Sequence, residues 1–247
     1  METIGIVIPC YNEAKRLKVE VFEKFAQNNL HIRLHFVNDG STDNTQEVLE
    51  KLVDKSDSIF VSKMEKNKGK AMAVHHGVKT CAEFNYSYIA YLDADLSIPL
   101  DEVNLLYQRI KEHDSMKMAF GSRIKTLNNK IERRVLRHIF GRIIATCISN
   151  SLKVAVYDTQ CGCKLFKKEL IQPLFEKEFI SPWLFDVELF WRMIVLYGRD
   201  KLPERALEVP LRECIHINDS KVKWTHSFKT FFQLIKIHRF YKNKAKN

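Results

Sequence analysis

Two aspartates, Asp93 and Asp95, follow directly on the apolar residues 89–92, which have the composition of a buried strand. Open α/β sheets bind their ligands in the crevice outside the carboxyl ends of parallel strands. Carboxylates at alternate positions there would offer oxygen ligands to a hard cation such as Mg²⁺ or Mn²⁺. The pair therefore predicts a metal site for a phosphorylated ligand, although by itself a solvated acidic loop explains it at least as well.

Short β-branched runs alternate with helical patterns through the first half of the chain. Strands are expected at 4–10, 34–38, 59–62 and 88–92, and helices at 15–27, 42–53, 68–82 and 99–113. This alternation predicts an α/β fold in which helices cover both faces of a mostly parallel central sheet. Asp43 and Gln46 are spaced to form a capping box at the start of the second helix.

The length of 247 residues suits one large α/β domain. We expect this domain over residues 1–220, followed by a basic amphipathic helix and tail over 221–247. No apolar stretch approaches the ~20 residues that cross a bilayer. Six scattered cysteines and a start without signal-peptide character favour a reducing, cytoplasmic protein.

Basic residues exceed acidic ones, with 40 Lys and Arg against 30 Asp and Glu, and they concentrate in residues 123–142 and 221–246. Both regions have helical patterns, over 131–152 and 224–241, in which cationic and large apolar residues are interleaved. Such helices either pack on the core with a solvated basic face or lie on an anionic membrane surface. The sequence leaves both readings open.

Several motifs occupy the ends of the expected strands. The first strand ends in Ile8-Pro9-Cys10-Tyr11-Asn12-Glu13, the second runs into residues 37–43, and residues 67–71 read Asn-Lys-Gly-Lys-Ala before the Asp93-Ala94-Asp95 triplet. In this order they resemble family 2 glycosyltransferases with the nucleotide-binding GT-A fold. Further on, residues 158–166 and 185–189 look like the branch that glycosylates polyprenyl phosphates, and most like dolichyl-phosphate glucosyltransferases.

The resemblance implies a donor site for a nucleotide sugar. In it, Asp95 would be the more direct ligand of Mg²⁺ or Mn²⁺, while Asp93 would meet the ribose or a metal-bound water. Aromatic rings stack on bases and carboxylates accept hydrogen bonds from base or ribose, which suits the implied nucleoside pocket. Residues implied to bind the donor are Pro9, Tyr11, Glu13, Asp39, Lys70 and Asp93.

The implied acceptor is a lipid monophosphate, whose second pKa of ~6 makes it largely dianionic at neutral pH. Catalysis would then depend on cations that position the phosphate rather than on a strong base. Asp158 would orient the acceptor or assist proton removal, and Glu188, on an apolar helix, would pair with a basic residue and orient the acceptor. The candidate cations are Arg123, which we favour, and Arg133, Arg134, Arg137, Lys164 and Lys221.

The expected function is inverting transfer of a hexose, glucose from UDP-glucose, to a polyprenyl or dolichyl phosphate. The enzyme would be peripheral on the cytoplasmic face of the membrane, with an integral membrane protein as a candidate partner and no role for nucleic acid. One alternative is a family 2 transferase that acts on a sugar hydroxyl in cell-surface polysaccharide synthesis, with Asp158 or Glu188 as general base.

Two other classes fit less well. Sugar nucleotidyltransferases are expected to carry a glycine-rich loop after the first strand, and residues 9–13 contain no glycine. A non-catalytic basic adaptor for membranes or nucleic acid would explain the charge but not the ordered acidic motifs.

Overall fold

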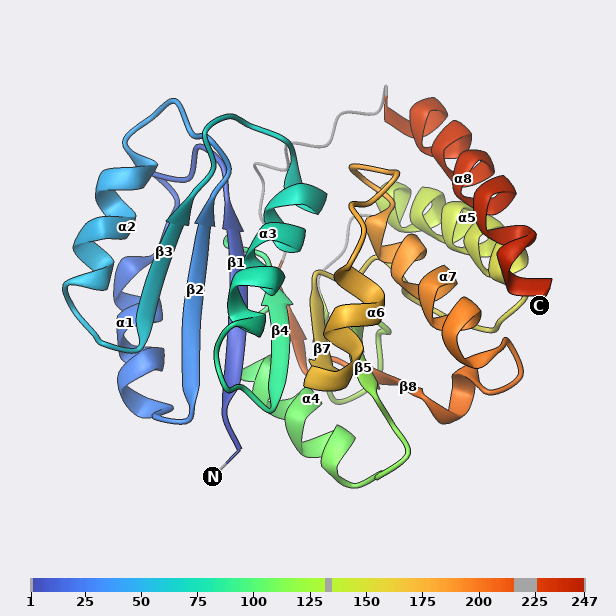
Figure 1. The fold of residues 1–247 in the computed structure, drawn as a ribbon, viewed down its shortest axis with the longest axis horizontal. Helices are drawn as coiled ribbons and strands as arrows, with labels where there is room; N and C mark the ends of the chain where they lie inside the picture. Colours follow the sequence, from blue (N-terminus) through green and yellow to red (C-terminus); the bar gives the residue numbers. More distant parts are fainter. Residues whose placement is uncertain (1, 132–134, 216–225, 247) are drawn as a thin grey trace.

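The computed structural model describes residues 2–131, 135–215 and 226–246, and of residues 135–140, 226–230 and 246 the backbone alone. A seven-stranded sheet with the order β3-β2-β1-β4-β7-β5-β8 crosses the molecule (Figure 1). All its strands run parallel except β7, which is antiparallel to both β4 and β5. The strands are β1 (Ile4–Cys10), β2 (Ile32–Asn38), β3 (Ile59–Lys63), β4 (Tyr88–Leu92), β5 (Met118–Ser122), β7 (Cys163–Lys167) and β8 (Ala206–Pro210).

Helices cover both faces of this sheet, as the alternating sequence pattern predicts. Helices α1, α2 and α4 contribute to one apolar cluster, and α3, α5, α6, α7 and α8 contribute to the other. The helices are α1 (Val19–Asn28), α2 (Thr45–Val53), α3 (Lys70–Ala82), α4 (Asp101–Lys111), α5 (Val135–Leu152), α6 (Ile171–Phe175), α7 (Phe185–Tyr197) and α8 (His226–Lys242), with 3₁₀ turns η1 (Lys168–Leu170), η2 (Leu202–Glu204) and η3 (Lys244–Lys246).

Strand β1 shows why the sequence forms this arrangement. Its side chains alternate between the faces, so that Ile4, Ile6 and Ile8 join the cluster with α1, α2 and α4, while Val7 joins the cluster with α3. All four side chains are fully buried. A strand that is apolar on both faces is typical of a parallel sheet covered by helices on both sides.

Several expected helix starts lie too early, as for the helix expected from Lys15, which begins at Val19. Two others have a visible structural cause. The helix expected from Thr42 begins at Thr45, and no capping box forms because the Gln46 amide instead accepts from Asn38 and donates to Glu50. The long helix expected from Ile131 begins at Val135, since Ile131 belongs to a second, two-stranded sheet of β6 (Lys130–Ile131) and β9 (Glu213–Cys214). This pairing partner lies far away in the sequence, so helical periodicity could not reveal it.

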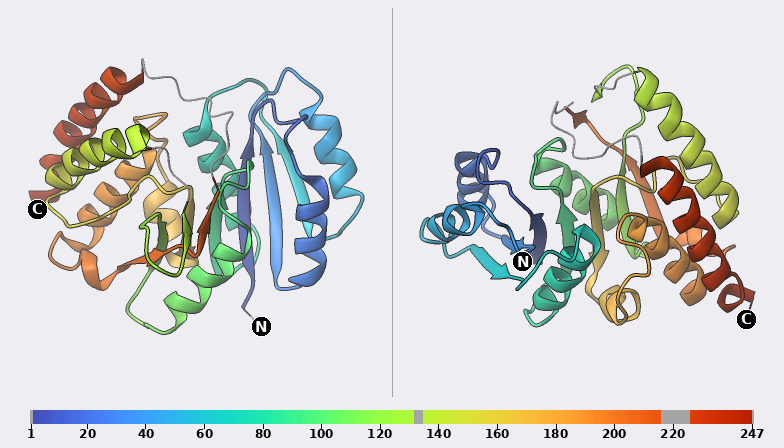
Figure 2. Two further views of the ribbon diagram at one scale, coloured as in Figure 1. Left: turned by 180° about the vertical axis from the view of Figure 1, so that it is seen from behind. Right: turned by 90° about the horizontal axis from the view of Figure 1, so that it is seen from above.

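Helix α8 lies beside α5 at the edge of the molecule away from β3 (Figure 2). It also packs against α7, and its Leu234, Ile237 and Tyr241 are buried in the core. The basic C-terminal segment is therefore attached to the α/β unit along much of its described length. Among the described residues, no helix is both long and apolar enough to cross a membrane.

Candidate active site

The loops after β1 and β2 lie side by side, held together by Asn12. This residue has a left-handed backbone (φ 51°), and its side chain bonds to Thr42 while its backbone N–H donates to the Ser41 hydroxyl. Pro9 lies half-buried next to the last residue of β1, and Tyr11 is 36% exposed at the start of the loop. Glu13 is nearly buried and accepts a 2.6 Å bond from Arg16. Of the implied nucleoside residues, Tyr11 thus presents the most open surface to a ligand.

Asp39 follows β2 and anchors the segment that leads into α3. Its two carboxylate oxygens accept hydrogen bonds from the backbone N–H groups of Lys68 and Gly69, both at 2.8 Å. Burial raises the pKa of Asp39, and these two donors partly oppose the shift. Gly69 has φ 88°, a conformation that favours glycine, so Asp39 and Gly69 together set where α3 and Lys70 begin.

Lys70 connects α3 to the aspartate pair after β4. Its ammonium lies 2.5 Å from Asp93 Oδ1 and 5.8 Å from the Phe185 ring centroid. Burial lowers the pKa of Lys70, but the carboxylates of Asp93, Asp186 and Asp95 outweigh it and raise the pKa above its usual value. A cation at this position would also attract the phosphates of a ligand that enters between the loops.

The two aspartates have different surroundings. Asp95 accepts a 2.9 Å hydrogen bond from the Ser97 N–H through Oδ1. The Asp93 carboxylate lies against the α-carbon of Gly162, where a Cβ atom would overlap it, and the Asp93 N–H donates to the Gly162 carbonyl at 3.3 Å. Gly162 precedes β7, the antiparallel neighbour of β4. The reversed strand thus brings a second loop to the carboxyl end of β4.

That second loop carries Asp158 to Arg123, which follows β5. Arg123 donates from Nε to Asp158 Oδ2 at 2.7 Å and from Nη2 to Oδ1 at 2.9 Å, and its backbone N–H also donates to Oδ2 at 3.2 Å. Burial opposes the charge of Arg123, but the Asp158 carboxylate raises its pKa further above the usual value. Asp158 is buried, and the Arg123 side chain is 31% exposed. This pair combines a fixed carboxylate with a partly accessible guanidinium.

The backbone around Asp158 is held from two further elements. Glu208 of β8 accepts hydrogen bonds from the N–H groups of Tyr157 at 3.1 Å and Asp158 at 2.9 Å. Arg142 of α5 donates to the Tyr157 carbonyl at 2.9 Å and stacks on the Tyr157 ring, 3.9 Å from its centroid. Asp158 is therefore placed by β5, β8 and α5 together.

Lys164 is not available as a phosphate ligand, contrary to the sequence expectation. It is fully buried, and its ammonium donates to the carbonyls of Thr159 and Cys161 and to Asp186 Oδ1. Asp186 also accepts a short hydrogen bond from the Tyr91 hydroxyl. The three donors of the lysine thus all have partners inside the protein.

Glu188 pairs with a basic residue, as expected, but the partner is Arg192 of its own helix, at 2.8 Å. The carboxylate is fully buried and also accepts from the Tyr241 hydroxyl and from the Ile180 N–H, both at 2.8 Å. Arg192 donates further to the carbonyls of Leu174, Lys177 and Glu178. This network ties α8 and the loop before α7 to the core. The hydrogen-bond partners of the Glu188 carboxylate in it are buried or partly buried groups of the protein.

Some predicted acceptor residues lie outside the described residues. These are Arg133, Arg134 and Lys221, and for Arg137 the backbone of α5 is described without its side chain. Of the candidate cations, the structure brings Arg123 to the edge that carries Asp93 and Asp158.

Sequence reasoning missed the residues that support this site, namely Asn12, Tyr91, Arg142, Gly162, Asp186 and Glu208. Gly162 and Asp186 lie within the motifs at residues 158–166 and 185–189, but the resemblance gave neither of them a role. Glu208 and Arg142 carry no sequence signal, since an isolated charged residue on a strand or helix is usually solvated.

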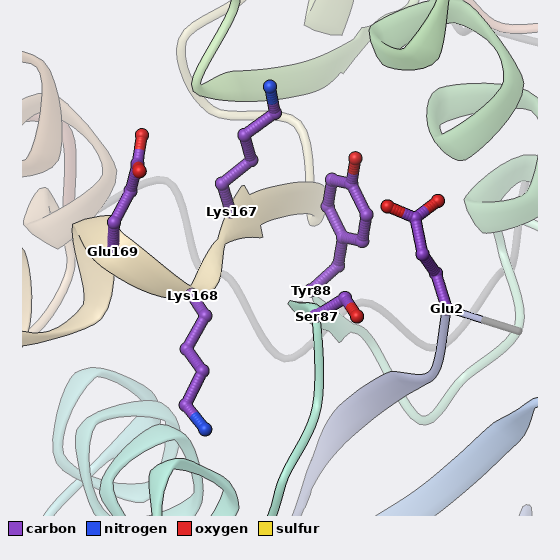
Figure 3. A pocket seen from close by; sticks show the side chains of 6 residues that line it. All are labelled: Glu2, Ser87, Tyr88, Lys167, Lys168 and Glu169. Carbon is purple, nitrogen blue, oxygen red and sulfur yellow. The ribbon is translucent and has the colours of Figure 1, made fainter.

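A separate open recess of about 560 Å³ lies at the amino end of β4, away from these residues. It is lined by Glu2, Ser87, Tyr88, Lys167, Lys168 and Glu169 (Figure 3). The ammonium groups of Lys167 and Lys168 are already bonded to the carbonyls of Asp114 and Phe84. The recess lies at the opposite edge of the sheet from the aspartate pair and is not part of the candidate site.

Solved structures share this architecture over nearly the whole chain. A glucosyl-3-phosphoglycerate synthase from Mycobacterium tuberculosis, crystallised with UDP, superposes with a TM-score of 0.70 at 17% identity, covering 96% of this chain and 80% of that one. Another crystal of this synthase, with Mn²⁺, UDP-glucose and phosphoglyceric acid, gives 0.68 at 15% identity and covers 96% and 80%. The fold is thus that of the GT-A glycosyltransferases, with acidic loops at the carboxyl edge of the sheet.

Sequence comparison is more specific. The Glycosyl transferase family 2 profile matches residues 5–175. A dolichyl-phosphate beta-glucosyltransferase of Trichomonas vaginalis is 30% identical over 253 residues, covering 97% of this chain and 74% of the relative, and a second from that organism is 32% identical over 94% and 69%. The chain belongs to glycosyltransferase family 2 and is a glycosyltransferase whose similarity to dolichyl-phosphate glucosyltransferases confirms the resemblance seen in its motifs.

Proposed function

We propose that this enzyme transfers glucose from UDP-glucose to a polyprenyl phosphate, dolichyl phosphate being one such lipid. The observation that carries the proposal is the arrangement of the aspartate pair after β4 and the Arg123–Asp158 pair after β5, joined at one sheet edge by the loop before β7. Relatives named dolichyl-phosphate beta-glucosyltransferase support the acceptor and the sugar, and a structural neighbour crystallised with UDP-glucose supports the donor.

The donor would bind across the loops of β1, β2 and β4. Tyr11 offers a ring for the base, Pro9 and Glu13 line the same loop, and Asp39 lies beside the start of α3. Lys70 would face the diphosphate from its position on Asp93. These roles account for the exposure of Tyr11 and for the cation placed among three carboxylates.

The residues present fit a divalent cation with the diphosphate as co-ligand. Asp93 and Asp95 offer carboxylate oxygens, and Gly162 leaves the Asp93 carboxylate the space that a side chain would fill. Among the described residues, no group of three acidic, histidine or cysteine side chains gathers as a complete protein cage. This suits Mg²⁺ or Mn²⁺, which bind through one or two carboxylates plus substrate phosphates. When bound, the metal would act as a Lewis acid that neutralises charge on the leaving diphosphate.

The acceptor phosphate would bind at Arg123, assisted by Arg133, Arg134, Arg137 and Lys221. A guanidinium matches two phosphate oxygens, and Asp158 holds the Arg123 guanidinium in one orientation. One phosphate oxygen forms the bond to the anomeric carbon as the bond from that carbon to the UDP oxygen breaks, so the configuration inverts. Asp158 orients this encounter, and the dianionic nucleophile has no proton to lose.

Membrane contact would involve α5 and α8, which lie side by side. Apolar side chains on them are exposed, Phe232 by 69%, Ile143 by 56% and Phe231 by 54%, and the basic Lys236 and Arg239 are exposed nearby. Aromatic groups beside cations are typical of helices that lie in an anionic membrane interface. We place the enzyme on the cytoplasmic face, with residues 221–247 as its membrane-binding segment and an integral membrane protein as a further partner.

Release of UDP from UDP-glucose, with Mg²⁺ or Mn²⁺ and with or without a short polyprenyl phosphate, tests the proposal. We expect turnover that requires both metal and lipid and that Asp95→Ala abolishes. Asp57→Ala is the matched control, because Asp57 is exposed in the turn before β3, at the other edge of the sheet. Metal-dependent donor binding without lipid-dependent turnover would reject the acceptor, and turnover with a different nucleotide sugar alone would reject the donor.

A further inference from the structure

Lys164 is a fully buried cation in the wall of the candidate site. A buried ammonium is costly unless each of its donors is satisfied. Here the distances are 3.0 Å to the Thr159 carbonyl, 2.8 Å to the Cys161 carbonyl and 2.5 Å to Asp186. Both carbonyls belong to the turn before β7, which is itself buried at residues 158, 159 and 161. The lysine therefore satisfies the inward-facing carbonyls of this turn.

The turn, residues 158–162, contacts a residue of the candidate site at each end. Asp158, which pairs with Arg123, begins the turn, and Gly162, which lies against the Asp93 carboxylate, ends it. The lysine is also tied to β4, because its partner Asp186 accepts from the hydroxyl of Tyr91, two residues before Asp93. In the sheet, Lys164 pairs with Tyr91 on one side and with Phe120 of β5 on the other. It thus lies between the strand that ends at Asp93 and the strand that leads to Arg123.

We infer that Lys164 is a positioning residue, whose ammonium fixes the turn of residues 158–162 and thereby the separation between Asp158 on the acceptor side and Asp93 on the donor side. The catalytic meaning of that separation rests on the proposed function. Misplacement by about 1 Å costs on the order of 10² in rate when a reaction depends on positioning. A hydrophobic side chain of the same length would fill the space but leave the two carbonyls without a donor.

Lys164→Met tests this inference in the full chain. We expect kcat to fall on the order of 100-fold, while UDP binding, measured without metal, changes by less than about threefold because the loops of β1 and β2 are untouched. Tyr86→Phe is the control, since it removes a buried 2.7 Å contact to His35 at the far end of the sheet. It is expected to lower the melting temperature and leave kcat unchanged.

The double variant Lys164→Met/Asp186→Asn separates positioning from stability. It also removes the carboxylate that the single variant leaves buried without its cation, so the melting temperature should recover towards that of the wild type. The carbonyls of residues 159 and 161 still lack their donor, so kcat should stay low. Recovery of kcat together with the melting temperature would overturn the inference.

Two readouts do not depend on the proposed substrates. Lys164→Met should speed hydrogen exchange at the amides of Asp158 and Asp93, which bond to Glu208 and to the Gly162 carbonyl, without a general loss of protection. It should also weaken binding of Mn²⁺ alone. A uniform rise in exchange, or unchanged exchange and Mn²⁺ affinity, would reject the positioning role even if the wild type uses other substrates. Absence of wild-type turnover with UDP-glucose and lipid would reject the proposed function only.

Discussion

Arg123 and Asp158, 35 positions apart, form a two-pronged ion pair, with Arg123 Nε at 2.7 Å from Oδ2 and Nη2 at 2.9 Å from Oδ1. A lysine has the same charge but cannot make both bonds in one plane. We expect Arg123→Lys to lower kcat on the order of 10², with a smaller effect on the Kd of UDP-glucose. Steady-state kinetics with varied lipid phosphate, alongside donor titration, measure the two effects. Equal losses in both would place Arg123 at the donor instead.

The pH dependence distinguishes a phosphate nucleophile from a hydroxyl nucleophile. The pKa of Arg123 is raised, so its charge and the stability it contributes persist far below that pKa and are lost only at strongly alkaline pH. Between pH 5 and 9, the rate should therefore rise through about pH 6, as the lipid phosphate becomes dianionic, and then stay level. In the Asp158→Asn variant the rate should still rise through about pH 6, but it should level off at a lower value. Loss of this rise in that variant would make Asp158 a general base and favour a sugar hydroxyl acceptor.

Gly162 leaves room for the Asp93 carboxylate. An added Cβ would overlap that carboxylate, so Gly162→Ala should displace it and weaken Mn²⁺ binding at least about tenfold. Gly5→Ala is the matched control, because its Cβ would meet the Tyr86 ring at 2.7 Å, far from the site. It should cost about 1–3 kcal/mol of stability without changing Mn²⁺ affinity. Calorimetric titration with Mn²⁺ and denaturant unfolding decide the matter, and equal Mn²⁺ affinities would contradict the assigned metal position.

Stability should depend on His35, which is buried against Tyr86. Burial lowers its pKa to about 4, from 6.5 in the unfolded chain. As pH falls, His35 therefore takes up its proton in the unfolded state before it does so in the folded state. The contribution of neutral His35 to the free energy of unfolding is complete above pH 6.5 and is lost as pH falls towards 4. This amounts to about 3 kcal/mol. Denaturant unfolding at pH 4.5 and 7 gives the free energy of unfolding at each pH. The difference between the two values should be smaller for His35→Phe/Tyr86→Phe than for the wild type, and an identical difference would refute the assignment.

The proposed membrane face combines charge with exposed aromatic residues. Binding to anionic liposomes should weaken in high salt, since attraction between exposed charges is screened. Replacing Phe231 and Phe232 by serine should lower the binding that remains in high salt. Co-sedimentation with phosphatidylserine-containing vesicles measures both effects. Retention of full binding by the double variant in high salt would rule out this face.

Much of the fold could be predicted because short, local sequence patterns indicate it. The alternation of strands and helices and the placement of Asp93 directly after a strand depend on periodicity within about ten residues. Parallel strands end at one edge, so the motifs at 9–13, 37–43 and 93–95 had to converge there. The match to the family 2 glycosyltransferase profile, over residues 5–175, includes these segments.

The partners of the buried charges were decided by tertiary structure. Lys164 looked like a free cation near the acceptor, yet the antiparallel strand β7 turns it inward onto two carbonyls and Asp186. Glu188 meets Arg192 and Tyr241, and Asp158 meets Arg123 across 35 residues. A charged side chain shows its type in the sequence, but its partner depends on which distant strand or helix packs against it, and that is set by the packing of the whole chain.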